Sequence, residues 1–314
     1  MRRRIAALFI ATLLSTSVVS CGGEAPPPAP PKQESVAAWA DVFEGTPDLY
    51  AVIRPQAMKR DGLYGSFFKA VVRAAQARGV ARGDTMVRAA EGAEEIIVGL
   101  SKGFDAALVL RGVPASLDPQ KITDAEGRAL FRPTSDRAKV IEYELLDRRH
   151  ADAGAVFVLP DRTWVGTLGD ARTRARQVFA MPARRPAPEV DPDALAVVRV
   201  SGPLVHALDR HPLYGMLSKK LTTALFALKP GKGGLVVGLT YADADATAWG
   251  EMQAKRVVEE LAKDGGAAGG VSESRAWLKT AKVTYEGTTV FVRVAVPPRL
   301  LEELPNASGA DLGL

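Results

Sequence analysis

The chain has 314 residues, 47% of them hydrophobic and 25% charged, a composition that excludes a largely disordered protein. Its formal net charge of +5 resembles that of a nucleic-acid-binding protein, but Arg2, Arg3 and Arg4 supply much of the excess. Removing these three from the 41 basic residues leaves 38 against 36 acidic residues. The remaining charges are interspersed in the sequence, so we expect no nucleic-acid partner.

The first 20 residues have the three parts of a secretory signal peptide. A basic head, Arg2–Arg4, is followed by an apolar run, Ile5–Leu14, and then by small residues up to Ser20. The apolar run is shorter than the roughly 20 apolar residues that a membrane-spanning helix needs. The sequence therefore predicts export followed by cleavage.

Cys21 follows directly and is the only cysteine in the chain, so no disulfide can form within it. The segment Val18-Val19-Ser20-Cys21 resembles the lipobox of bacterial lipoproteins. The resemblance implies cleavage between Ser20 and Cys21, a thioether-linked diacylglycerol on Cys21, and a fatty acyl chain such as palmitate on its new amine. A lone cysteine can also be a buried, inert thiol, but Cys21 lies between an apolar segment and a proline-rich one.

Several acyl chains together would anchor the protein stably on a membrane. The residue after the cysteine is Gly22, not aspartate, and by the same resemblance this favours the outer membrane, facing the periplasm or the cell surface. Residues 21–36 then form a linker, because Glu24–Ser35 is rich in proline and favours an extended polyproline II stalk. The globular part begins near residue 37.

Four sequence blocks occur twice, in the same order, which predicts a tandem duplication with halves at 37–185 and 186–314. Short aliphatic runs recur in many sheet proteins, so a single match carries little weight. The paired blocks are Leu49–Arg54 with Leu195–Arg199, Arg60–Gly65 with Arg210–Gly215, Ile96–Ser101 with Leu235–Thr240, and Val156–Val158 with Val290–Val292.

In the first half, periodicity and turn residues predict a strand at 48–54 and a helix around 67–75. A hairpin of strands 94–101 and 104–112 follows, then a short helix at 118–125. Asp170 is expected to cap a helix that ends at Phe179. The remaining predicted strands of this half are 139–146, 155–159 and 163–168.

In the second half we expect a strand at 194–200, then a helix carrying Leu217, Leu221, Leu225 and Leu228. Strands at 234–241 and 244–250, a helix at 252–263 and a glycine-rich loop at 264–270 follow. Strands at 280–286 and 289–296 and a short helix near 299–304 complete the chain. The order predicts an α+β fold with a mostly antiparallel sheet, helices on one face, and two related β-α-β-β-α-β halves.

The duplicated turns supply the candidate binding residues Arg60, Tyr64, Arg210 and Tyr214. Arginine offers a planar fork for carboxylate or phosphate, and tyrosine an amphipathic platform. Related by pseudo-symmetry, the four could line a cleft. The competing interpretation is structural: Leu63 and Tyr64 would staple the start of the following helix.

Signals for catalysis and metal binding are weak. His206 and His211 are five residues apart, which does not place them on one helical face as in zinc proteases. Asp243, Asp245 and Thr247 begin like a calcium loop but lack its later glycine and glutamate, and strand alternation places them on a wet face. We therefore expect no metal, no catalytic centre and no cofactor beyond the lipid on Cys21.

These observations together predict a membrane-anchored cell-envelope lipoprotein with a non-enzymatic binding or scaffold role. Its partner would be an envelope protein, a glycan or a lipid. The alternative is a periplasmic carrier of a lipid or other apolar ligand, for which an apolar cavity would be required. An envelope enzyme is a third, disfavoured alternative.

Overall fold

A computed structural model describes much of the chain, apart from its N-terminal 37 residues, several internal segments and its C-terminus. The signal peptide, Cys21, the proline-rich linker, Arg210, Tyr214 and the loop at 264–270 lie outside the described residues. The described residues are 38–43, 45–65, 68–69, 72, 84–101, 105–123, 127–137, 139–146, 154–181, 190–209, 215–231, 234–263, 277–298 and 301.

The described part divides into two compact units. The N-terminal unit takes in residues 38–57 and 84–190, and the C-terminal unit takes in 58–72 and 191–301. The short helix α2 (Pro55–Arg60) lies at the division between Ala57 and Met58.

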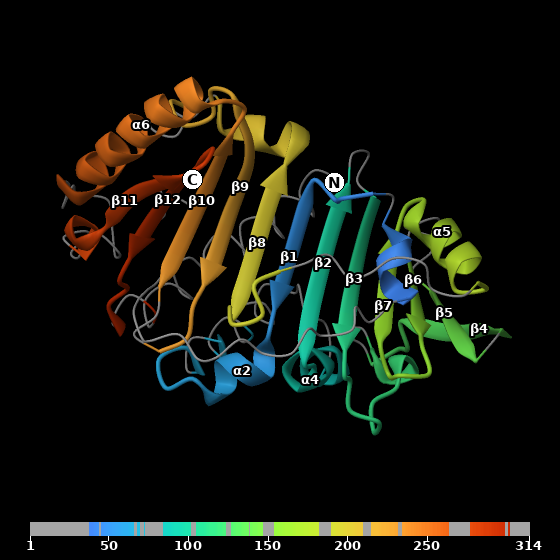
Figure 1. The fold of residues 1–314 in the computed structure, drawn as a ribbon. Helices are drawn as coiled ribbons and strands as arrows, with labels where there is room; N and C mark the ends of the chain where they lie inside the picture. The colour runs from blue at the N-terminus through green and yellow to red at the C-terminus, as the bar shows by residue number, and fades with distance from the viewer. Residues whose placement is uncertain are drawn as a thin grey trace, which may run out of the picture. The chain divides into compact units, whose positions relative to one another are not determined.

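Antiparallel strands of the N-terminal unit follow the order β1-β2-β3-β7-β6-β5-β4 (Figure 1). The first three form a meander, and the hairpin of β6 and β7 then returns so that β7 pairs with β3. The strands are β1 (Leu49–Ile53), β2 (Glu95–Ser101), β3 (Asp105–Arg111), β4 (Phe131–Arg137), β5 (Val140–Leu145), β6 (Gly154–Val158) and β7 (Trp164–Leu168).

Helices cover both faces of this sheet. Successive strand residues point to opposite faces, so Val109 packs with η1 (Ala38–Val42) and α5 (Ala171–Val178), whereas Leu110 packs with α4 (Asp84–Gly92). The short η2 (Pro119–Lys121) lies on the same side as α4. The prediction of helices on one face is therefore not confirmed.

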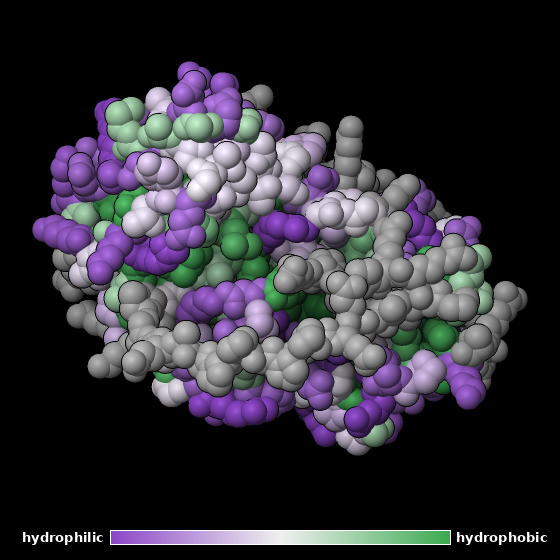
Figure 2. All heavy atoms as spheres, viewed as in Figure 1, coloured by the Kyte–Doolittle hydropathy of each residue, from purple (hydrophilic) through white to green (hydrophobic). Residues whose placement is uncertain are grey.

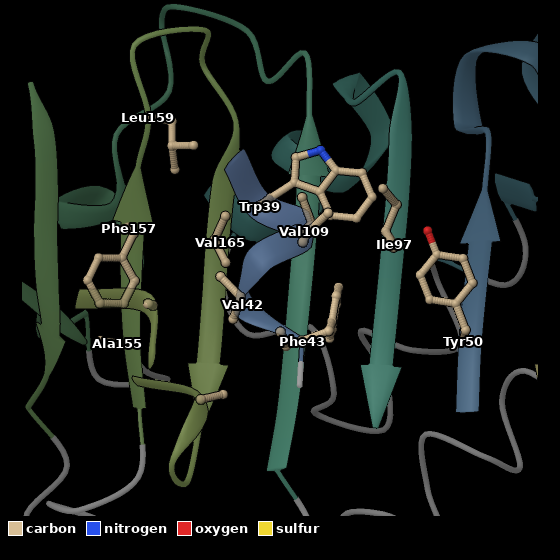
Figure 3. Close-up of a cluster of buried hydrophobic side chains, with 14 of the residues drawn as sticks. Trp39, Val42, Phe43, Tyr50, Ile97, Val109, Ala155, Phe157, Leu159 and Val165 are labelled. Atoms are coloured by element: carbon tan, nitrogen blue, oxygen red, sulfur yellow. The ribbon is translucent and has the colours of Figure 1, made fainter. Parts of the chain in front are cut away.

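An aromatic cluster joins η1 to the sheet (Figure 3). The rings of Trp39 and Phe43 meet edge to face at 6.4 Å, and those of Phe43 and Tyr50 at 6.3 Å. Phe43 lies directly against Gly99 of β2, where an added Cβ would fall 2.1 Å from the Phe43 ring. Glycine at this position therefore makes room for the ring.

The C-terminal unit has strand order β11-β12-β10-β9-β8. Helix α6 (Ala244–Lys263) packs on β10, β11 and β12, while η4 (Gly202–Leu208) packs on β8 and β9. Their shared core includes Val205, Leu239, Tyr241, Ala254 and Val290. The strands are β8 (Ala196–Ser201), β9 (Leu221–Leu228), β10 (Leu235–Tyr241), β11 (Lys282–Glu286) and β12 (Thr289–Val294).

Three of the four spaced leucines, Leu221, Leu225 and Leu228, lie in a strand and Leu217 lies in a turn before it, so the prediction of a helix there is wrong. Residues Leu221–Leu228 form β9, paired with β8 on one side and β10 on the other. Leu221, Ala224 and Leu228 are all buried, which gives an apolar spacing that imitates a helix. Thr222 and Thr223 favour an extended backbone, and pairing with β8 and β10 stabilises the strand over a helix.

The predicted strand at 244–250 is also wrong, because helix α6 begins at Ala244 and runs without interruption to Lys263. Asp243 caps it: the backbone N–H of Ala246 donates to Asp243 Oδ1 at 2.8 Å. Thr247 is buried, not on a wet face, and its hydroxyl donates to the Asp243 carbonyl at 2.8 Å.

The predicted duplication is not confirmed. Ile96–Ser101 lies in β2, next to β1, whereas its sequence counterpart Leu235–Thr240 lies in β10, which is separated from β8 by β9. The matched blocks thus occupy different places in the two strand orders. By position in the meander, the counterpart of β2 is β9.

Most of the other predicted elements are confirmed within a few residues, namely the strands β1, β2, β3, β5, β6, β7, β8, β10, β11 and β12 and helix α5. Asp170 precedes α5 as expected but makes no side-chain capping bond. The predicted helix at 118–125 shrinks to η2, and β4 and α4 were not predicted. Among the helices described, none is long and apolar enough to cross a membrane.

Candidate functional site

The turn after α2 contains the described half of the predicted binding residues. Arg60 is exposed at the end of α2, while Tyr64 is fully buried. Between them, Asp61 Oδ1 accepts the backbone N–H groups of Leu63 at 2.8 Å and Tyr64 at 3.1 Å. Asp61 Oδ2 accepts the N–H of Gly231, in the turn between β9 and β10, at 2.7 Å.

Asp61 therefore holds the turn in place through three backbone hydrogen bonds, a role that the sequence analysis did not predict. Burial of the phenol, and secondly the nearby Asp61 charge, raise the pKa of Tyr64 above its ordinary value. A buried Tyr64 offers no platform at the surface, so Arg60 is the accessible member of the pair. Arg210 and Tyr214 lie outside the described residues, and a cleft joining all four stays a prediction.

Among the described carboxylates of the N-terminal unit, the most enclosed is Glu142 on β5, which is 5% exposed. Two arginines of α5 hold it. Arg172 donates from Nε at 3.1 Å and from Nη2 at 3.0 Å to Glu142 Oε1. Arg176 donates from Nε to Oε2 at 2.9 Å and from Nη2 to Oε1 at 2.6 Å.

Burial alone would raise the pKa of Glu142, but hydrogen bonds and charge from Arg176 and then Arg172 lower it below its ordinary value. The same contact raises the pKa of Arg176. Glu142 is therefore ionised near neutral pH, with both oxygens occupied. The cluster ties α5 to β5 and holds no group free for proton transfer.

Four further arginine contacts extend this pattern. Arg174 of α5 donates to Asp105 Oδ2 at 2.9 Å and to the backbone carbonyl of Val42 at 3.2 Å. At the start of β2, Arg54 binds Glu95 Oε1 at 3.0 Å and Arg111 binds Glu95 Oε2. The one sequence signal for these ion pairs is the regular spacing of arginines in Ala171–Val178. Arginines on a helix surface are common, however, and most of them do not bind a buried carboxylate.

The C-terminal unit has a partly exposed apolar surface that we call the Gly238 face, formed by Leu225, Val236, Gly238 and Phe291. Gly238 of β10 lies opposite Leu225 of β9 and Phe291 of β12, and all three large side chains are half-buried. The side chains of Leu239 and Tyr241 point to the other face, towards α6. Figure 2 shows hydrophobic residues over the strands of this unit, below α6.

A Cβ at Gly238 would lie 3.5 Å from both Leu225 and Phe291, an ordinary contact distance. Gly238 thus lies between two apolar side chains, and neither of them occupies the space that a Cβ at this position would take. Such a surface can accept an apolar group of a partner or a ligand. This face is not predictable from the sequence pattern, because it depends on the pairing of β9, a segment whose apolar spacing predicts a helix.

Among the described residues, no group of three or more His, Cys, Asp or Glu side chains could hold a metal ion. His206 Nδ1 lies 3.5 Å from Asp209 Oδ2, and both side chains are at least half exposed. His211 falls outside the described residues.

No protein-family model and no curated protein matches the chain. Two crystal structures of TP0453 are similar to it, crystal forms I and III, each with a TM-score of 0.52. Form I is 9% identical and covers 84% of this chain and 95% of its own, and form III is 10% identical and covers 85% and 98%. At this identity the likeness is one of fold, and it extends over most of both chains.

Proposed function

We propose that the protein is a lipid-anchored lipoprotein of the bacterial cell envelope, with a body that binds or scaffolds a partner and catalyses no reaction. One observation carries the proposal: a basic head and short apolar run lead to Val18-Val19-Ser20-Cys21. Cys21 is the proposed site of lipid attachment. The proposed location is the outer membrane, facing the periplasm or the cell surface, because Gly22 follows the cysteine.

The side-chain chemistry of the body supports binding in preference to catalysis. Glu142 and Glu95 each bind two arginines, so these carboxylates link secondary-structure elements to one another. The Gly238 face, in contrast, leaves Leu225, Val236 and Phe291 partly exposed, with the Arg293 guanidinium over the Phe291 ring. We assign partner contact to surfaces of this kind, with an envelope protein or glycan as the partner.

A second candidate function is the transport of a lipid or another apolar ligand, and the half-buried Leu225, Val236 and Phe291 favour it. Native mass spectrometry of the chain extracted from its own envelope separates the two. A stoichiometric extra mass of lipid size, lost when Gly238 is replaced by Trp, supports the carrier function. A protein that carries only its covalent lipid supports partner binding.

Anchoring is tested by changing Cys21→Ser and partitioning whole cells with a detergent that separates into two phases. We expect the unaltered chain in the detergent-rich phase and the variant in the aqueous phase or in an unprocessed form. Ser17→Ala, outside the lipobox, is the matched control and should behave as the unaltered chain. A processed Cys21→Ser variant that stays detergent-bound would contradict the proposal.

Sorting is tested separately with Gly22→Asp. The lipobox resemblance predicts that this variant moves from the outer to the inner membrane on a density gradient while remaining lipidated. An unchanged distribution would remove the outer-membrane assignment and leave the anchoring itself intact.

A further inference from the structure

We propose that two copies of this chain associate through β11, which would pair with the β11 of a second copy around a two-fold axis at Thr284. Strand β11 lies at the end of the C-terminal unit's strand order and pairs with β12, its one strand neighbour in the described part of the chain. Lys282, Thr284, Tyr285 and Glu286 are all exposed, Tyr285 to 59%. An exposed edge strand is a template for another strand.

The backbone of β11 is oriented for such pairing. Glu286 and Thr289 flank a two-residue turn with Gly287 at φ +57°, which is the type II′ hairpin arrangement. The two residues that flank such a turn hydrogen-bond to each other through their backbones. Along an antiparallel pair, every second residue from there on bonds to the partner strand in the same way. Lys282, Thr284 and Glu286 therefore direct their backbone groups to β12, while Val283 and Tyr285 direct theirs to the outer edge.

The sequence of β11, Lys-Val-Thr-Tyr-Glu, is complementary to itself in the antiparallel direction. Pairing centred on Thr284 places Lys282 opposite Glu286 of the second copy and Val283 opposite its Tyr285. Opposite charges and aromatic–β-branched pairs are the favourable cross-strand combinations. The two-fold axis makes each contact twice, as in most homodimers.

Charge within one copy favours the same partner. Lys282 lies directly opposite Arg293 on β12, a like-charge pair that destabilises a sheet. The Glu286 side chain is 72% exposed, with Arg293 Nη2 at 3.7 Å. A second copy would bring its Glu286 carboxylate to Lys282, which has no carboxylate within ion-pair distance among the described residues.

Strand β4, the outer strand of the N-terminal unit, lacks these properties. Its Pro133 has no N–H to donate, and its register with β5 shifts between Pro133 and Ser135. Both features discourage the addition of another strand. The self-association surface is therefore assigned to β11.

The proposal is tested with Thr284→Cys in the full chain, expressed in its own envelope and treated with a mild oxidant. In the proposed pair the two Thr284 Cα atoms are about 4.5 Å apart, which suits a disulfide. Lys282→Cys is the matched control, because its two copies would lie about 14 Å apart along the strands. The unaltered chain reveals any link through Cys21.

We expect a covalent dimer from Thr284→Cys, at least about fivefold more abundant than from Lys282→Cys, by non-reducing electrophoresis. Co-expressed Lys282→Cys and Glu286→Cys copies should also cross-link to each other. No dimer from Thr284→Cys, equal dimers from both single variants, or a cross-link to a different protein would overturn the proposal.

Charge exchange provides a second test that does not depend on disulfide geometry alone. Adding Glu286→Lys to Thr284→Cys places like charges opposite each other twice and should reduce cross-linking several-fold. Adding Lys282→Glu as well should restore it. Cross-linking that is unaffected by Glu286→Lys, or is not restored by the exchange, would contradict the proposed register.

Discussion

The two units share part of their strand order but cover it differently. Each has a three-strand meander and a hairpin whose last strand pairs with the third, and the N-terminal unit adds β4 and β5. In the N-terminal unit, helices pack on both faces, and arginines of α5 bind Glu142 of β5 and Asp105 of β3. In the C-terminal unit, α6 and η4 supply one core and the Gly238 face stays half-buried. The shared strand order thus supports a core on both faces in one unit and a half-buried apolar face in the other.

The glycines Gly99 and Gly238, aligned by the sequence repeat, show the same contrast at a single residue. The ring of Phe43 fills the space beside Gly99, whereas Gly238 has only ordinary contacts with Leu225 and Phe291. A shared sequence block therefore does not mean a shared environment.

The largest effect is expected for Glu142→Gln, which leaves Arg172 and Arg176 without their buried counter-charge. Breaking a buried ion pair costs about 3 kcal/mol at the low end, and the low end applies because Arg176 reaches solvent. Urea unfolding should show this loss, and hydrogen exchange should place it in the N-terminal unit. The exposed pair of Arg132 and Glu144 is the matched comparison: Arg132→Gln should cost less than about 1 kcal/mol.

Gly99→Ala should destabilise the N-terminal unit by about 2 kcal/mol, because the new methyl group overlaps the Phe43 ring. Gly238→Ala should be neutral or slightly stabilising, since alanine suits a strand better than glycine. Thermal unfolding of both variants measures the difference. Adding Phe43→Leu should recover part of the Gly99→Ala loss, and equal losses at both glycines would contradict the contrast.

A smaller effect is expected from pH. Because folding lowers the pKa of Glu142, its contribution is complete above the ordinary value of 4.5 and is lost as the pH falls through the lowered value. The stability difference between the unaltered chain and Glu142→Gln should therefore shrink on acidification. A difference that stays constant from neutral pH to pH about 3 would show that Glu142 is not held as a charged group.

The smallest effect is expected for Asp243→Ala, which removes the cap of α6. Asp243 accepts the N–H of Ala246 and binds Lys220, and these contacts, in that order, lower its pKa. Hydrogen exchange should accelerate at Ala246 and Thr247, in the first turn of α6, and leave the N-terminal unit unchanged. Lys220→Ala keeps the cap and is the control. Unchanged exchange in Asp243→Ala would exclude this capping role.

Much of the sheet was predictable because its strands are short apolar runs bounded by turn residues, as in β2, β3, β10 and β12. The prediction of helix or strand was wrong where the residue spacing fits both. The leucines of β9 are spaced as in a helix, although the segment is a strand. Asp243–Thr247 alternates as in a strand, although Asp243 caps a helix. In β9 the local pattern is overruled by pairing with β8 and β10. At Asp243 a local signal, the cap bond from Ala246 three residues later, outweighs the alternation.

The candidate sites were less predictable than the fold. Tyr64 was predicted as an exposed binding residue from a repeated sequence block, but its side chain is buried. Its backbone N–H donates to Asp61 in the turn after α2. Glu142 and its arginines are 30 and 34 residues apart in sequence, and the packing of α5 against the sheet brings them together. The Gly238 face likewise depends on three strands in register, which composition and spacing do not encode.

The most direct test of the proposed function is mass spectrometry of the N-terminal peptide of the protein purified from its own membranes. The account predicts a peptide that begins at Cys21, with a diacylglyceryl group on the sulfur and an acyl chain on the amine. A peptide that begins at Met1, or a Cys21 that carries a free thiol, would contradict lipid anchoring and with it the proposed envelope role.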